Sequence, residues 1–179
     1  MSVAKKTIRC SLDPRSISKA MREIEKRKRE LSENAERLAK LVADRIKDTA
    51  QQGFGAALVD DLLNGGGRTA DVSVTTDYTG KTVLVIASGE DAVWVEFGAG
   101  VHHNGDVGSS PHPNGGELGF TIGSYGKGRG ARHVWGYYPN NDKNEPLVLT
   151  HGTPAAMPMY NAVQTVCAEL ADIAKEVWK

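Results

Sequence analysis

Apolar residues in the N-terminal third of the chain recur every three or four positions, which is the period of a helix. Lys, Arg and Glu occupy most positions between them. Asp13 and Pro14 supply a cap and a first turn, and Gly53 supplies a C-terminal cap. The pattern therefore predicts an amphipathic helix over residues 14–50, with a narrow apolar stripe formed by Ile17, Ala20, Met21, Ile24, Leu31, Ala35, Leu38, Val42, Ile46 and Ala50.

A helix of this length measures about 55 Å at 1.5 Å per residue. A compact domain of 179 residues has a radius of gyration of only about 16 Å. The helix must therefore either bend in the apolar-poor stretch Glu25–Glu30 or project from the body, and the pattern leaves both arrangements open. A projecting helix would need a partner for its stripe.

Shorter apolar runs predict strands and a second helix in the rest of the chain. Thr7–Leu12 alternates like a short strand. Val72–Thr76 and Thr82–Ser88, joined by a Thr79-Gly80 turn, predict a β-hairpin whose more apolar second strand is the better buried. Two further short strands are expected at Val134–Tyr138 and Leu147–Thr150, and a C-terminal helix at Met159–Trp178.

The order of these elements predicts an α+β fold with a long N-terminal helix, a mostly antiparallel sheet and a C-terminal helix. A chain of 179 residues suits a single domain, here residues 1–179. Residues 101–133 are rich in Gly and His and lack apolar periodicity, so they are expected to form a flexible loop.

Charge is divided unevenly along a chain whose net charge is zero. Residues 1–50 carry 14 Lys and Arg against 8 Asp and Glu, a net charge of +6, which leaves −6 for residues 51–179. This division favours contacts between unlike surfaces of neighbouring copies, or an oppositely charged partner; a solvated basic helix face explains it equally well.

Two cysteines and the absence of a long apolar run predict the redox state of the thiols and the solubility of the chain. Cys10 and Cys167 are expected to be reduced, partly buried thiols. Cys167 lies in the predicted C-terminal helix, where an inert buried thiol is common. The longest apolar stretch, Val83–Ala87, is far shorter than the about 20 residues that span a bilayer, so we expect a soluble protein.

Histidines in the Gly-rich loop are the first candidates for a metal site. His102, His103 and His112 share this loop with Asp106, and a His/Asp cluster can bind a divalent cation. A loop with so many glycines does not hold metal ligands at fixed positions. We therefore expect the imidazoles to lie at the surface and to bind no metal. No cofactor is expected either, because Gly123–Gly130 lacks the spacing of a phosphate-binding loop.

Three basic side chains, Lys127, Arg129 and Arg132, lie between Tyr125 and Trp135. Basic residues near aromatic rings can contact a phosphate backbone and stack on bases. Three charges are few for a nucleic-acid groove, so nucleic-acid binding is here the alternative interpretation.

Three segments together resemble the minor tail or tail-completion proteins of long-tailed bacteriophages, which act in head–tail joining. Ala92–Gly100 (AVWVEFGAG) is similar to the family's YVEFGTG segment. Ile122–Gly130 leads to the WGYY of Trp135–Tyr138. Thr150–Ala162 (THGTPAAMPMYNA) is similar to the proline-punctuated entry into the family's last helix. The resemblance covers nearly the whole chain, with Ala99 where Thr is common and a long His/Gly insertion after Gly100.

The resemblance implies a non-enzymatic virion protein that forms a homo-oligomeric ring at the head-proximal end of a phage tail, after assembly in the host cytoplasm. It implies contacts with head-connector and tail-tube proteins and none with a membrane, and it allows DNA to pass through the ring lumen. Candidate interaction residues are Arg22, Arg29, Arg37, Trp94, Glu96, Phe97, Lys127, Arg129 and Arg132. The alternative is a small metal- or nucleic-acid-binding phage protein that uses the His/Gly-rich loop or the basic helix.

Overall fold

A computed structural model describes residues 7–63, 71–79, 82–89, 91–100, 112–118, 135–138, 142–150, 152–153 and 155–178. Three helices and six short strands follow one another along this part of the chain. Their order is helix α1 (Pro14–Leu63), strands β1 (Ser73–Thr79) and β2 (Thr82–Ser88), helix α2 (Ala92–Phe97), strands β3 (Ala99–Gly100), β4 (Trp135–Tyr137), β5 (Val148–Thr150) and β6 (Gly152–Thr153), and helix α3 (Pro158–Val177). The predicted α+β class is confirmed.

Helix α1 begins where the sequence predicts. The Asp13 carboxylate accepts a hydrogen bond from the Ser16 N–H at 2.9 Å, and the Ile17 N–H donates to the Asp13 carbonyl at 3.0 Å. The Ser11 hydroxyl and the Ser16 N–H, both donating to this carboxylate, hold the pKa of Asp13 below its ordinary value. Asp13 therefore caps the first turn, as expected of this residue type.

The predicted end of this helix at Gly53 is wrong. Helix α1 continues through Gly53 to Leu63 and is 50 residues long, or about 75 Å. Phe54, Ala56, Ala57 and Leu58 follow Gly53 and are tolerated or favoured in helices. A β-carbon built on Gly53 would lie 2.9 Å from the Pro158 Cβ, so the start of α3 packs directly against the α1 backbone at this glycine.

Gly53→Leu is therefore expected to lower the free energy of unfolding by about 1–3 kcal/mol, because the rigid Pro158 ring cannot move aside cheaply. Gly55→Leu is the matched control, since a β-carbon at Gly55 meets no atom within 4 Å. Leucine favours a helix over glycine, so the control should be neutral or stabilising by up to about 1 kcal/mol. Chemical denaturation of both variants measures the difference, and equal losses would contradict the close packing.

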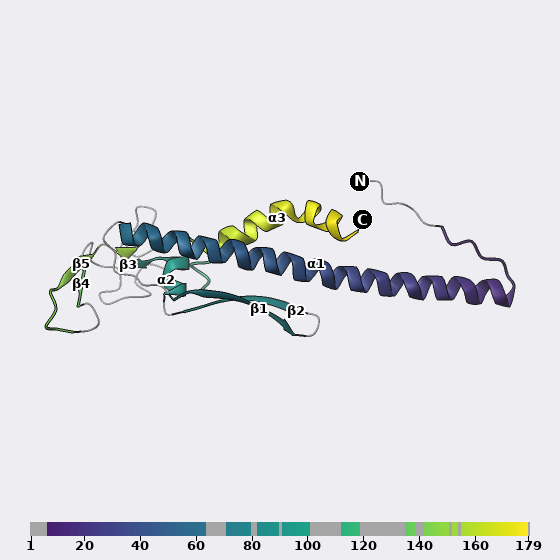
Figure 1. The fold of residues 1–179 in the computed structure, drawn as a ribbon, viewed down its shortest axis with the longest axis horizontal. Helices are drawn as coiled ribbons and strands as arrows, with labels where there is room; N and C mark the ends of the chain where they lie inside the picture. Colours follow the sequence, from purple (N-terminus) through teal and green to yellow (C-terminus); the bar gives the residue numbers. More distant parts are fainter. Residues whose placement is uncertain are drawn as a thin grey trace.

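Helix α1 projects from the body of the molecule, which answers the question that the pattern left open (Figure 1). Helix α3 lies antiparallel to it, starting beside Gly53 and ending near Arg45, where the Arg45 guanidinium pairs with Glu176 at 2.9 Å and Glu169 at 3.5 Å. The hairpin β1–β2 packs on the same half of α1. The N-terminal half extends beyond both.

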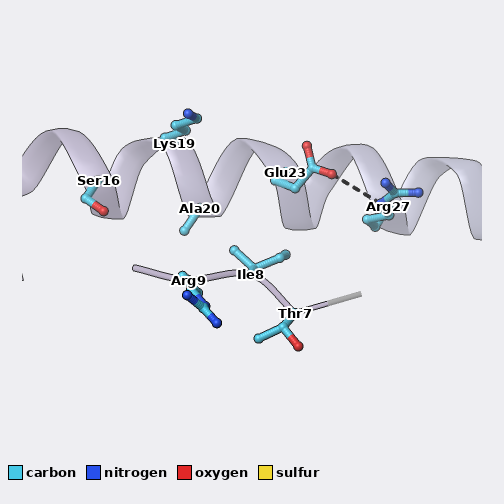
Figure 2. Close-up of a pocket in the computed structure, with 8 residues that line it drawn as sticks. All are labelled: Thr7, Ile8, Arg9, Ser16, Lys19, Ala20, Glu23 and Arg27. Atoms are coloured by element: carbon cyan, nitrogen blue, oxygen red, sulfur yellow. Dashed lines mark hydrogen bonds and ion pairs between the residues drawn. The ribbon is translucent and has the colours of Figure 1, made fainter. Parts of the chain in front are cut away.

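Residues 7–11 do not form the predicted strand. This segment turns back along the first turns of α1, and Ile8 points toward Ala20 across a pocket of about 410 Å³ (Figure 2). The rest of the pocket lining consists of Thr7, Arg9, Ser16, Lys19, Glu23 and Arg27. No neighbouring strand is available there among the described residues, so the alternation of Ile8 and Cys10 has nothing to pair with.

The predicted hairpin is confirmed, but the expectation about its second strand is wrong. β1 and β2 are antiparallel, with Val74 opposite Ala87 and Asp77 opposite Leu84. Val74 in β1 is buried, together with Val72 just before it, whereas Leu84 and Ile86 in β2 are 48% and 41% exposed. The continuous apolar run of β2 therefore presents one side to the core and the other to solvent.

The remaining strands form two more antiparallel pairs. β3 pairs with β6, and β4 pairs with β5. In the described residues the strands thus form three separate two-stranded sheets. The C-terminal helix is confirmed as α3; two of its apolar side chains, Val163 and Leu170, are 37% and 42% exposed.

The hydrophobic core cluster of the described residues lies where α1, the hairpin, α2 and α3 meet. Phe54 of α1 is fully buried at its centre. Ala50, Val72, Val74, Ala92, Val95 and Ala162 complete this cluster. Because α1, β1, α2 and α3 each contribute at least one residue, the body is held together by contacts between segments that are distant in sequence.

Candidate functional site

Helix α2 carries a carboxylate into the interior of the molecule. Its six residues end at Gly98, whose φ of 80° lies in the left-handed region that favours glycine. Val95 and Glu96 are buried, at 2% and 7% exposure, while Trp94 is about one-third exposed. A carboxylate is rarely buried unless it has partners, so the surroundings of Glu96 define the first site to consider.

Glu96 caps the N-terminus of α3. Its Oε2 accepts a hydrogen bond from the Met159 N–H at 2.8 Å, and its Oε1 accepts one from the Tyr160 N–H at 2.9 Å. The residue before α3, Met157, has a left-handed backbone (φ 53°) and makes no side-chain cap. A negative charge at a helix N-terminus also interacts favourably with the helix dipole. Glu96 thus satisfies donors that α3 cannot satisfy itself.

His112 completes the surroundings of this carboxylate. Its Nε2 lies 3.2 Å from Glu96 Oε1, and its Nδ1 accepts a hydrogen bond from the Asn114 N–H at 3.1 Å. Because Nδ1 accepts, the proton resides on Nε2, which donates to Glu96. The imidazole is 8% exposed and packs against Phe97 and Tyr160, with ring centroids 4.4 and 5.3 Å away. The expectation of a surface imidazole is therefore wrong for His112.

Backbone hydrogen bonds join the same two parts of the chain. The Ala156 N–H donates to the Val95 carbonyl at 2.9 Å. Next to it, β3 pairs with β6, with Ala99 opposite Thr153. We call this unit the capping joint, defined as Ala92–Gly100 together with His112, Gly152–Thr153 and Ala155–Tyr160. It brings the first and third of the three resembling segments into contact.

The chemistry of the capping joint is that of a structural connection. The three donors around Glu96 leave its carboxylate engaged on both oxygens. Within the described residues, no group of three or more His, Cys, Asp or Glu is placed to hold a metal ion. His102, His103 and Asp106 lie outside the residues that the structure describes. Of the proposed ligand cluster, only His112 is placed, and it is bound to Glu96.

Of the other candidate residues, Trp94 and Phe97 belong to this joint, and the rest lie on α1 or outside the residues that the structure describes. Arg22, Arg29 and Arg37 are exposed on α1. Phe97 is half-buried against His112. Lys127, Arg129 and Arg132, and most of the predicted loop at 101–133, lie outside the described residues. Glu96 was expected on an acidic interaction surface; it is instead inside the subunit, because α3 needs an acceptor at its first turn.

Sequence reasoning missed His112 as the partner of Glu96. Its only local signal is Asn114 two residues later, which is too common to be informative.

Both cysteines are more exposed than expected. Cys10 and Cys167 are free and exposed. Cys167 lies on the face of α3 that is turned away from α1.

Comparisons with protein-family models, with curated proteins and with solved structures find no match to this chain. No helix in the described part of the chain is both long and apolar enough to cross a bilayer.

Proposed function

We propose that this chain is a structural virion protein, a tail-completion or head–tail joining subunit that forms a ring at the head-proximal end of a phage tail. The observation that carries this proposal is the capping joint. Two segments that resemble the tail-completion family, separated by about 50 residues of sequence, meet there through Glu96. One structural unit thus accounts for both resembling segments. A chance match of two short motifs gives no reason for the two segments to be in contact.

The shape of the subunit supports assembly with other copies. Helix α1 extends from the body, and Arg22, Arg29 and Arg37 are exposed on it. Exposed carboxylates of the acidic remainder, including Asp77, Asp142 and Glu145, offer an opposite charge. A ring requires two unlike surfaces on each subunit, and a basic helix with an acidic body supplies them. Head-connector and tail-tube proteins are the proposed neighbours, in the virion neck.

Reversing the three arginines tests this contact. The triple variant Arg22→Glu, Arg29→Glu and Arg37→Glu should assemble poorly, because like charges facing across an interface cost several kcal/mol. The fold should be retained within about 1 kcal/mol, since all three side chains are exposed. Electron microscopy with mass measurement, circular dichroism and complementation of a defective phage provide the readouts.

The matched control is the triple variant Arg22→Lys, Arg29→Lys and Arg37→Lys, which keeps the charge and should assemble like the native chain. A folded Glu variant that still forms rings and restores infectivity would remove the basic face of α1 from the interface. A native chain that forms no ring at any concentration, alone or with its neck partners, would contradict the proposed function itself.

The second candidate function is nucleic-acid or metal binding by the basic helix or the His/Gly-rich loop. The net charge of +6 over residues 1–50 favours it. Binding to DNA that weakens steeply as salt rises would support this candidate. Its absence, together with a thermal midpoint that a chelator leaves unchanged, would favour the ring subunit.

A further inference from the structure

Helix α3 covers one apolar face of α1 over only part of its length. Helix α3 covers it from Gly53, beside Pro158, to the region of Leu41, beside Val177. Beyond the end of α3 the same face continues with large apolar side chains that are open to solvent. We call these the distal stripe: Ile17 (41% exposed), Met21 (57%), Ile24 (55%) and Leu31 (60%).

The spacing of the distal stripe is that of a coiled coil. Positions 17, 21, 24, 28, 31, 35 and 38 alternate in steps of four and three, which is the a/d pattern of three successive heptads. Five of the seven are Ile17, Met21, Ile24, Leu31 and Leu38, one is Ala35, and one is Lys28. A strict 3.5-residue repeat keeps one narrow seam facing a single neighbouring helix. The missing partner of this face is therefore a helix.

We propose that the distal stripe of α1 pairs with the distal stripe of a second copy of this chain, in an antiparallel coiled coil. The stripe continues an interface that already exists, because α3 lies antiparallel on the same face of α1 farther along. The helix of a second copy running the same way would extend the line of α3. Two identical stripes related by a two-fold axis form a self-complementary contact, which is the commonest kind between identical chains.

Charge selects the antiparallel orientation. Lys28 is the charged residue among the seven seam positions. In a parallel pair in register, the two Lys28 side chains would share one layer of the seam, and like charges that face each other across an interface are unfavourable. In an antiparallel pair the a position of one helix packs against the d position of the other, so Lys28 faces Ile24 or Leu31 of the second copy.

This pairing goes beyond the proposed ring and uses a different surface. At about 100° per residue, Arg22 and Arg29 lie about 160° around the helix from Ile24 and Leu31. The basic face can thus contact a ring neighbour while the apolar stripe contacts another copy. A substitution can therefore disrupt one of the two interfaces and leave the other intact.

Sedimentation of the purified chain over a range of about 1 µM to 1 mM tests the pairing. The seam has only three heptads and contains a lysine, so a reversible association that increases with concentration is expected. The double variant Ile24→Gln and Leu31→Gln should weaken it by at least about tenfold, since each copy loses two apolar side chains from the seam.

The matched control is Lys26→Gln and Glu33→Gln, which introduces the same residues at the same seven-residue spacing on the opposite face and keeps the net charge. Both control side chains are exposed, so the control should associate like the native chain. Circular dichroism checks that α1 is retained in each variant.

Cross-linking tests the orientation in a background in which the two exposed native thiols are replaced, Cys10→Ser and Cys167→Ser. A disulfide needs Cα atoms within about 7 Å. In a parallel pair, Ile17→Cys would meet its counterpart and form a disulfide. In the antiparallel pair the two positions lie at opposite ends, about 25 Å apart or more, and no disulfide should form.

Three outcomes would overturn the inference. The native chain could remain monomeric at every concentration, the stripe variant and the control could associate equally, or Ile17→Cys could cross-link readily. Rings that persist in the stripe variant, without pairs in the native chain, would overturn this inference alone and leave the proposed function standing. Loss of rings in the arginine variant with pairing intact would leave this inference standing.

Discussion

Replacing Glu96 by alanine is expected to lower the free energy of unfolding by about 3 kcal/mol or more. Three donors lose their acceptor at once: the Met159 N–H, the Tyr160 N–H and the His112 Nε2–H. A hydrogen bond to a charged group is worth about 1.5–3 kcal/mol, and a buried donor without an acceptor adds its own penalty. Urea denaturation followed by circular dichroism measures the loss.

Glu33→Ala is the control, because it removes an exposed glutamate from the projecting part of α1 and should change stability by no more than about 0.5 kcal/mol. Glu96→Gln should fall between the two, since the amide keeps one acceptor oxygen and loses the charge at the α3 N-terminus. If Glu96→Ala cost no more than Glu33→Ala, the capping joint would not hold α2 against α3.

Phe54→Ala is expected to cost about 3–5 kcal/mol, the usual loss for a fully buried phenylalanine. Phe54 belongs to the cluster that joins α1 to the hairpin and α2, so the cavity would open where all of these elements meet. Gln52→Ala, at an exposed position two residues earlier on the same helix, should change stability by no more than about 0.5 kcal/mol. Thermal and chemical denaturation of both variants would show the contrast, and a small effect at Phe54 would mean that the body does not depend on this contact.

Much of the fold follows from local pattern. The cap at Asp13, the hairpin around Thr79 and the C-terminal helix depend on residues close together in sequence, and each was predicted correctly. The end of α1 was not predicted correctly, because a glycine such as Gly53 occurs in two structural settings. Glycine commonly follows the end of a helix, but it is also required where another helix packs against the backbone. Only the position of Pro158, more than 100 residues later, distinguishes them.

The capping joint could be predicted only in part. Glu96 and the proline-rich entry to the last helix were singled out, yet their contact was not, because nothing in either segment specifies a distant partner. The burial of Glu96 reversed its expected role. A glutamate in an apolar run is consistent with a surface carboxylate or with a buried cap, and the difference is set by the unsatisfied N–H groups of α3.

The pairing of β3 with β6 has a consequence for the length of the chain. Gly100 lies opposite Gly152, so the chain leaves the joint and returns to it at adjacent points. Closing a longer excursion costs little, about 0.6 kcal/mol for each doubling of its length. The stretches 101–111 and 119–151, on either side of the segment that carries His112, can therefore differ in length in relatives of this chain while the cap on α3 stays the same. Because a longer loop costs so little, an affinity tag or a small domain could be inserted just after Gly100.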